Sequence, residues 1–187
     1  MKLICGLLCL AALLTGCTGE KKPLQQAMDL RQGLLEARGC SFDARITADY
    51  GDSIQSFTLS CQGDRQGNLT FQVMAPENIG GIGGTVEERG GALRFDGTAL
   101  YFPLLTDDQL SPVSAPWIFL RTLRGGYLRG AGKDGSYLMV TASDSYRQDA
   151  LQVDFWLDGD NAPVRGEILW KNRKILTLEL ENFQLIS

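Results

Sequence analysis

The chain has 187 residues, of which 18 are Lys or Arg and 22 are Asp or Glu, so its formal net charge at pH 7 is −4. This acidic balance argues against a nucleic-acid partner, which requires clustered basic surface. The sequence contains no histidine, which removes the most common general base and metal ligand and every Ser-His-Asp or Cys-His arrangement. A hydrolase would need a rarer carboxylate or lysine mechanism, so we expect no enzyme, no cofactor and no metal site.

The N-terminus has the features of an export signal. Residues 1–16 combine Lys2 with an apolar run of about a dozen residues, which is too short to span a bilayer comfortably. The segment Leu14-Thr15-Gly16-Cys17 resembles the bacterial lipobox. The resemblance implies cleavage before Cys17 and attachment of a diacylglyceryl group to its sulfur. The alternative is an ordinary secretory signal with an incidental cysteine.

Cleavage before Cys17 would leave 171 residues with a net charge of −5, because Lys2 is lost with the signal. We expect residues 17–22 to be a polar tether and residues 23–187 to form one domain with a substantial core. Two acyl chains on one cysteine would hold the protein at a membrane. The expected location is therefore the cell envelope, on the outer face of the cytoplasmic membrane or at an outer membrane.

The first element of the domain is a helix predicted over residues 23–38, with Gly39 as its C-terminal stop. Its apolar residues fall on one stripe, which favours packing against a sheet. The residues of this stripe are Leu24, Ala27, Met28, Leu34 and Leu35.

Residues 40–50 and 52–61 are predicted to form a hairpin around Tyr50-Gly51. Pairing Asp49 with Asp52 keeps the apolar residues on one face and sets Cys40 opposite Cys61, with Cα atoms about 4.5 Å apart. This spacing allows a disulfide in an exported domain, worth about 3 kcal/mol on the chain-entropy model. The alternative is two buried free thiols.

Short strands recur through the rest of the chain, separated by turn residues, and one helix interrupts them. The helix is predicted from a cap at Ser114, through Pro116 in its first turn, to Gly125-Gly126. The dipeptide Gly90-Gly91 predicts a two-residue hairpin turn. The predicted strands cover residues 68–74, 85–89, 92–96, 98–102, 136–141, 151–157, 164–171 and 175–183.

Three stretches together carry a resemblance to a known family. They are Leu69-Thr70-Phe71-Gln72-Val73-Met74-Ala75-Pro76, then Val153-Asp154-Phe155-Trp156-Leu157-Asp158 leading to Ala162-Pro163-Val164-Arg165-Gly166-Glu167-Ile168, and Leu176-Thr177-Leu178-Glu179-Leu180-Glu181-Asn182-Phe183. With the lipobox, this succession resembles the LolA/LolB-like superfamily of lipoprotein carriers and receptors. The resemblance implies an α+β, mainly β fold: a curved antiparallel sheet, or open half-barrel, with helices covering its concave side.

The resemblance also implies a cavity that holds acyl chains of lipids or lipoproteins, in a carrier or receptor. A soluble carrier has no anchor, so Cys17 favours a membrane-tethered receptor. An interaction or sensor module that binds another exported protein is the alternative function. The residues available to line a cavity, with a filled core as their alternative role, are Phe42, Phe57, Leu59, Phe71, Val73, Trp117, Leu120, Val153 and Phe155.

Other motifs have simpler interpretations. The glycine-rich residues 80–84 lack the Gly-Lys-Ser/Thr ending of a phosphate loop and indicate a turned connection. The acidic residues 158–161 form too short a set for calcium. Two basic stretches are expected to be solvated faces, with phospholipid head groups as the alternative partner; they are Arg121, Arg124, Arg129 and Lys133, and then Lys171, Arg173 and Lys174.

Overall fold

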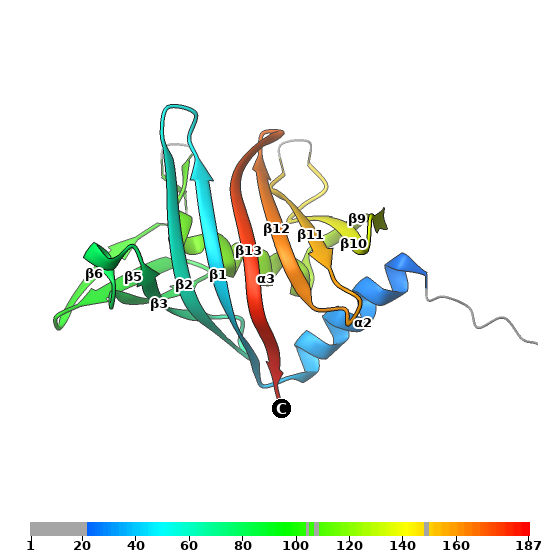
Figure 1. The fold of residues 1–187 in the computed structure, drawn as a ribbon, viewed down its shortest axis with the longest axis horizontal. Coiled ribbons are helices and arrows are strands. Elements are labelled where there is room, and N and C mark those ends of the chain that lie inside the picture. Colours follow the sequence, from blue (N-terminus) through cyan, green and yellow to red (C-terminus); the bar gives the residue numbers. More distant parts are fainter. Residues whose placement is uncertain (1–21, 104, 107–108, 148–149) are drawn as a thin grey trace, which may run out of the picture.

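A computed structural model describes residues 22–103, 105–106, 109–147 and 150–187. Within these residues, eleven strands form one antiparallel sheet in the order β6-β5-β4-β3-β2-β1-β13-β12-β11-β10-β9 (Figure 1). The sheet is curved and open, with β6 and β9 as its two edges. The predicted mainly β half-barrel with helices is therefore confirmed.

The large sheet follows the chain as two meanders that meet where β1 pairs with β13. Its strands are β1 (Gly39–Asp49), β2 (Ile54–Asp64), β3 (Leu69–Ala75), β4 (Gly83–Glu87), β5 (Gly90–Phe95), β6 (Thr98–Phe102), β9 (Tyr127–Asp134), β10 (Tyr137–Ser143), β11 (Gln152–Leu157), β12 (Pro163–Trp170) and β13 (Arg173–Ile186). The other elements are the helices α2 (Pro23–Glu36) and α3 (Ala115–Gly125), the 3-10 turns η2 (Glu77–Ile79) and η3 (Pro112–Ser114), and the short pair β7 (Leu105–Thr106) and β8 (Gln109–Leu110).

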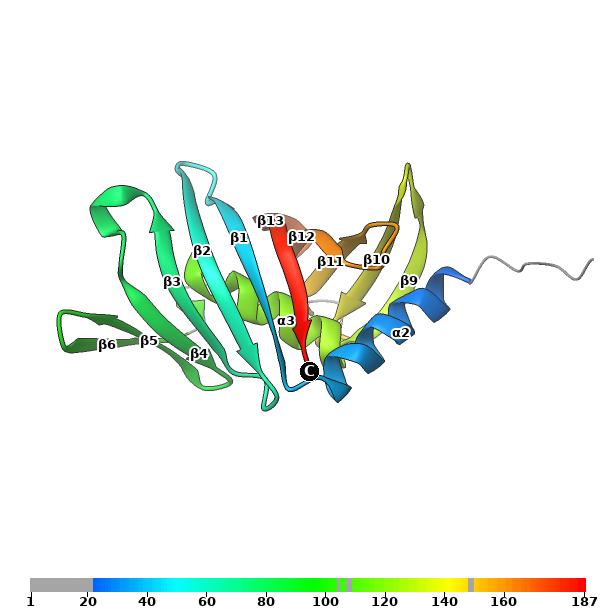
Figure 2. The same cartoon turned by 60° about the horizontal axis from the view of Figure 1, so that its bottom comes forward.

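Helix α3 crosses the concave side of the sheet (Figure 2) and packs against β2, β10, β12 and β13. Eight of its eleven residues are buried, as expected for a helix enclosed by a curved sheet. Phe119 anchors it, because its ring packs edge-on against Phe155, with centroids 4.9 Å apart. The same ring lies over Gly166 of β12, where a Cβ would come within 2.5 Å of it.

Helix α2 lies beside the β9 edge and packs against β9, β10 and α3. Its predicted apolar stripe is only partly correct: Ala27 and Leu34 of the stripe are buried, and so is Leu30, which the stripe did not include. The remaining residues of the predicted stripe are about half exposed: Leu24 (51%), Met28 (45%) and Leu35 (49%). A helix at the margin of a sheet has neighbours on a narrow side only, which explains the difference.

Two arginines connect the helices reciprocally. Arg31 of α2 donates to the carbonyl oxygens of Leu123 and Gly126 at the end of α3, each at 2.8 Å. Arg124 of α3 donates to the carbonyl oxygen of Leu34 in α2 at 3.4 Å. A cation at a helix C-terminus donates hydrogen bonds to the unpaired carbonyl oxygens and interacts favourably with the negative end of the helix dipole. Burial lowers the pKa of Arg31.

The predicted register of the first hairpin is wrong by two residues. Asp49 pairs with Ile54, so four residues form the turn, and Cys40 lies opposite Gly63 while Cys61 lies opposite Phe42. A two-residue shift keeps every side chain on its predicted face. It makes the two cysteines diagonal neighbours, with Cα atoms about 7–8 Å apart, at or beyond the reach of a disulfide.

The structure accordingly holds Cys40 and Cys61 as buried free thiols, so the predicted disulfide is not found. Burial raises the pKa of both thiols. Both are only 3% exposed, within the main core, and act as small apolar side chains there.

Two further differences concern the strands. The β4–β5 turn falls at Glu88 and Arg89, because Glu87 pairs with Gly90. Gly91 instead lies inside β5, where a Cβ would come within 2.3 Å of the Phe102 ring. Strand β9 was not expected, since its glycines and charged residues lack the alternation of a half-buried strand; as an edge strand it needs little apolar surface.

Candidate functional site

A cavity of about 360 Å³ lies between α3 and the neighbouring ends of β10, β11 and β12. Helix α3 contributes five residues spaced so that they share one face of the helix. Most of the lining is apolar, with a few polar groups, as in small-molecule sites. The lining residues are Leu110, Trp117, Ile118, Arg121, Thr122, Gly125, Gly126, Asp144, Leu151 and Trp170.

Hydrogen bonds fix two walls of the cavity. The indole Nε1 of Trp117 donates to the carbonyl oxygen of Gly67 at 2.9 Å, which sets the orientation of its ring. The hydroxyl of Tyr50, in the β1–β2 turn, donates to the carbonyl oxygen of Leu110 at 3.0 Å. Burial raises the pKa of Tyr50, so this hydroxyl remains a donor at neutral pH. These contacts fix the orientation of Trp117 and the position of Leu110 in the cavity wall.

Glycine residues keep the C-terminal end of α3 open. Nothing lies within 4 Å of a Cβ built on Gly125. At Gly126, a Cβ would stand 2.6 Å from the carbonyl oxygen of Thr122, so no larger residue fits without a backbone shift. Gly125 therefore leaves free space at this end of the cavity, whereas Gly126 allows the close approach of Thr122.

Trp170 forms the wall opposite α3. Its Nε1 is buried and has no hydrogen-bond acceptor among the described residues. A buried donor without an acceptor costs about 1–3 kcal/mol, and each such group in a native structure requires an explanation.

Charged groups stand around the apolar walls. The Arg121 guanidinium lies 5.2 Å from the Trp117 ring centroid and pairs with Glu88 at 3.2 Å. The Lys171 ammonium lies 5.8 Å from the centroid of Trp170. The carboxylate of Asp144 accepts the backbone N–H of Leu151 at 3.1 Å. The cavity thus combines an apolar interior with a charged mouth, which suits an amphiphile.

Of the nine residues predicted to line a cavity, only Trp117 lines this one. Phe57 is partly buried and packs against the core. The other seven are at most 6% exposed and belong to the main hydrophobic core: Phe42, Leu59, Phe71, Val73, Leu120, Val153 and Phe155. Alternation identifies the inward face of a strand, but it does not show whether the space beneath is filled.

The sequence reasoning missed Ile118, Leu151 and Trp170. Ile118 and Leu151 carry no pattern that separates them from ordinary core residues. Trp170 offers one weak signal, because a tryptophan at the end of a strand directly precedes the basic stretch that begins at Lys171.

The predicted basic stretches divide by role in the structure. Arg124 binds backbone carbonyls, and Arg129 donates to the hydroxyl of Ser143 at 2.9 Å and to the carbonyl oxygen of Ser145. Lys174 pairs with Glu167 at 3.1 Å. Arg121 and Lys171 instead stand at the cavity.

Cys17 and the predicted signal lie outside the described residues, so the structure says nothing about lipidation. In the part of the chain that the structure describes, no helix is both long and apolar enough to cross a membrane. The same residues contain no group of three or more potential metal ligands. The acidic residues 158–161 form a turn, in which the carboxylate of Asp158 accepts the backbone N–H of Asp160 and of Ala162.

No protein-family model and no curated protein matches the sequence. Similar solved structures include an uncharacterized conserved protein from Thermus thermophilus, with 12% identity, 89% of each chain covered and a TM-score of 0.47. A LolA superfamily protein from Nitrosomonas europaea gives 8% identity over 86% of this chain and 94% of that chain, with a TM-score of 0.45. The lipoprotein LppX from Mycobacterium tuberculosis gives 13% identity over 86% of this chain and 92% of that chain, with a TM-score of 0.41.

All three TM-scores are below 0.5, so the likeness concerns the arrangement of the sheet and helices and transfers no function to this chain. The open antiparallel half-barrel described above rests on the strand order of this chain alone.

Proposed function

We propose that this chain is an envelope lipoprotein, anchored through a diacylglyceryl group on Cys17, that binds an acyl chain of a lipid or lipoprotein as a carrier or receptor. The observation that carries the proposal is the apolar cavity between α3 and Trp170. The lipobox-like segment supports the location, and the absence of histidine from the sequence supports a binding rather than a catalytic role.

The size of the cavity limits what it accepts. At about 30 Å³ for each water-sized group, 360 Å³ holds on the order of a dozen such groups. That corresponds to one acyl chain of moderate length rather than two long ones. Burying about ten methylenes would contribute about 8 kcal/mol at about 0.8 kcal/mol each. A gain of about 8 kcal/mol would by itself correspond to a Kd of about 1 µM, and subtracting about 4 kcal/mol or more for association and chain ordering weakens the expected Kd to about 1 mM.

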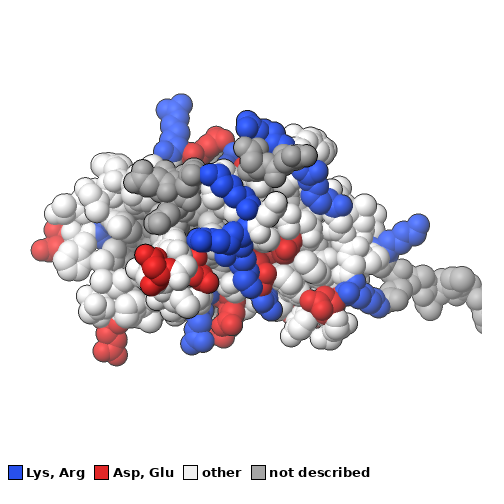
Figure 3. Space-filling model, turned by 90° about the horizontal axis from the view of Figure 1, so that it is seen from above, with Lys and Arg blue, Asp and Glu red and all other residues white. Residues whose placement is uncertain are grey.

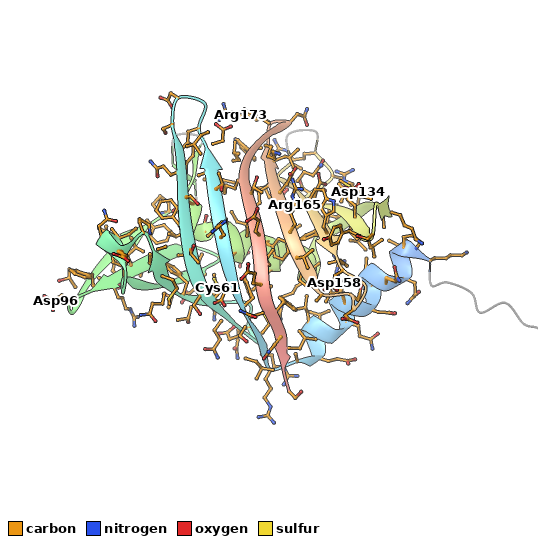
Figure 4. All side chains as sticks on the ribbon, in the orientation of Figure 1. Cys61, Asp96, Asp134, Asp158, Arg165 and Arg173 are labelled. Carbon is orange, nitrogen blue, oxygen red and sulfur yellow. The ribbon has the colours of Figure 1, made fainter. Side chains whose placement is uncertain are left out.

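Tryptophan fluorescence tests this proposal directly. Trp117 and Trp170 line the cavity, whereas Trp156 is not a lining residue: its Nε1 donates to Asp134 and its ring stacks against Arg165, both of which are labelled in Figure 4. Every helix and strand of the described residues lies between Pro23 and Ile186, so a polypeptide of residues 22–187 keeps the whole described fold. The neutral probe 11-bromoundecanol should quench the tryptophan fluorescence of this polypeptide saturably, because a bromine atom quenches only a nearby indole.

Two Trp→Phe variants, one single and one double, give matched controls. Trp156→Phe should leave saturable quenching intact, while the double variant Trp117→Phe, Trp170→Phe should abolish it with little change in the circular dichroism spectrum. The proposal fails if the probe does not quench, or if the emission of Trp156 is quenched to the same extent as that of the other two.

A second candidate is an interaction module that binds another exported protein. The observation favouring it is the β5–β6 hairpin, where Phe95, Leu100 and Tyr101 are 62%, 65% and 81% exposed beside the unpaired edge of β6. An exposed apolar edge strand is suited to pairing with another chain. A photo-crosslinking residue at Tyr101 should then capture one specific protein in intact cells, whereas the same residue at exposed Tyr137 should not.

A further inference from the structure

The edge strand β6 lies at the end of the sheet opposite to β9 and α2 (Figures 1 and 2). Its five residues, Thr98–Phe102, include no charged residue, no proline and no glycine, and its pairing with β5 has no bulge. Charges, prolines and bulges are what protect exposed sheet edges from pairing with other chains. In Figure 3, the end of the molecule that carries this hairpin, on the left as in Figure 1, is mostly white. The edge therefore lacks the usual protection.

The other edge of the same sheet is protected. Strand β9 contains Arg129, Lys133 and Asp134, and helix α2 packs against it. A second copy of the chain that pairs through its own β6 closes the assembly at two, because both remaining edges are then protected β9 strands. A copy that presented β9 to β6 would instead leave a free β6 and continue into a filament.

The backbone of β6 presents its free hydrogen-bonding groups in a fixed pattern. Both residues of the β5–β6 turn have positive φ, as in a two-residue hairpin, so the pair that closes it, Phe95 and Thr98, is hydrogen-bonded. Bonded and non-bonded pairs alternate along an antiparallel ladder. The N–H and C=O groups of Ala99 and Tyr101 therefore point away from β5, toward the free edge.

A two-fold axis at Leu100 matches these groups. Two antiparallel β6 strands centred there place Ala99 of each copy opposite Tyr101 of the other, so the outward groups of both strands bond to each other. The two Leu100 residues form a non-hydrogen-bonded pair, with Cα atoms about 4.5 Å apart. Because β6 carries no charge, the two strands bring no like charges opposite each other.

Large and small side chains alternate across this junction on the convex face. Within one copy, Ala92 pairs with Tyr101, and Arg94 pairs with Ala99. The axis extends each of these rows into the other copy. Tyr101 of one copy then lies between its own Ala92 and the Ala99 of the other, so a large side chain has a small one on both sides.

The concave face shows the same alternation. Phe102 packs against the core, and its ring covers Gly91, where a Cβ would come within 2.3 Å of it. Phe95 pairs with Thr98. Across the axis, Thr98 of one copy lies opposite Phe102 of the other, so each threonine is flanked by two aromatic rings. The strand is thus complementary in shape to a second copy of itself.

The area that this pairing covers indicates how strong it is. Phe95, Leu100 and Tyr101 are 62%, 65% and 81% exposed. At about 200 Å² for an aromatic side chain, and somewhat less for leucine, they amount to on the order of 400 Å² in each copy. The total of about 800 Å² is below the roughly 1,200 Å² of stable interfaces, which describes a weak, reversible dimer. The membrane anchors proposed above would raise its effective concentration.

We infer that β6 pairs with β6 of a second copy of this chain, about a two-fold axis at Leu100, and joins two eleven-stranded sheets into one. The inference goes beyond the proposed function, because no residue of the β5–β6 hairpin lines the cavity between α3 and Trp170. Quenching by 11-bromoundecanol is therefore the same in one copy and in the dimer, and either proposal can fail without the other.

Disulfide formation tests the register of the pairing. In residues 22–187, Leu100→Cys should form a linked dimer on oxidation with copper phenanthroline in air, because the two Cα atoms are within the reach of a disulfide. Thr98→Cys is the matched control, since it is exposed on the same face but lies about 13 Å along the strand from its equivalent. We expect at least about fivefold more dimer from Leu100→Cys. The native Cys40 and Cys61 are buried and do not interfere.

Sedimentation equilibrium tests the association without a crosslink. The average mass of residues 22–187 should rise from one copy toward two as the concentration increases from about 10 µM to about 1 mM. Leu100→Lys should stay at the mass of one copy with an unchanged circular dichroism spectrum, because two ammonium groups would oppose each other on the axis. Tyr137→Lys should associate like the wild type, since Tyr137 is also exposed but lies in the β9–β10 hairpin.

Three results would overturn the inference: a wild type that keeps the mass of one copy at about 1 mM, equal crosslinking of the two cysteine variants, or wild-type association of Leu100→Lys. The photo-crosslinking residue at Tyr101 in intact cells should give a product of two copies of this chain. A product that contains a different protein instead overturns the inference in favour of the interaction module.

Discussion

Replacing Arg31 with Met would test how the helical cover is held over the sheet. Methionine keeps an unbranched apolar stem and a good helix propensity, so the change removes mainly the guanidinium. The guanidinium donates two bonds of 2.8 Å to the carbonyls of Leu123 and Gly126. Bonds to a charged group contribute about 1.5–3 kcal/mol each, and partial exposure of Arg31 places both at the lower end. We therefore expect a loss of about 3 kcal/mol.

Urea unfolding followed by circular dichroism measures this loss, together with a fall in Tm of about 6–12 °C for a domain of this size. The matched control is Arg45→Met, because the Arg45 side chain is 67% exposed and its pair with Glu179 spans 3.8 Å. That change should cost less than about 1 kcal/mol. Equal losses in the two variants, or a loss below about 1 kcal/mol for Arg31→Met, would refute the reasoning that Arg31 fastens α3.

Further predictions concern packing and the buried thiols. Gly166→Val should destabilise the fold by about 1–3 kcal/mol and weaken 11-bromoundecanol quenching, because a Cβ there meets the Phe119 ring at 2.5 Å and must displace α3; unchanged thermal unfolding would contradict this. Cys61 should react with maleimide at pH 7.5 only in denaturant, because it is buried and its pKa is raised; rapid labelling of the native protein would contradict that. Because the pKa of Cys61 is raised above its unfolded value near 9, the stability that depends on the neutral thiol is complete below pH 9 and is lost as the pH rises above it. Cys61→Ala should therefore reduce the decrease in the free energy of unfolding between about pH 9 and 11.

The sequence by itself determined most of the elements and the inward faces of the strands, although β9 and the short pair of β7 and β8 were not predicted. Alternation in residues such as Leu69, Phe71 and Val73 depends only on the two-residue repeat of a strand, and all three are buried. The stop after α3 follows from Gly126. The half-barrel was predicted from the resemblance to the LolA/LolB-like superfamily, whereas the local pattern indicated only a succession of short strands and two helices.

Tertiary structure decided the register of the first hairpin, the state of Cys40 and Cys61, and the position of the cavity. Periodicity cannot distinguish registers that differ by two residues, because both keep the same residues inside. The cavity depends on where Phe119 packs α3 against Gly166 and on the free space beside Gly125, and neither is visible in a one-dimensional pattern. Leu110, Leu151 and Trp170 meet α3 only after the sheet curves, since packed volume is a property of elements that are distant in the sequence.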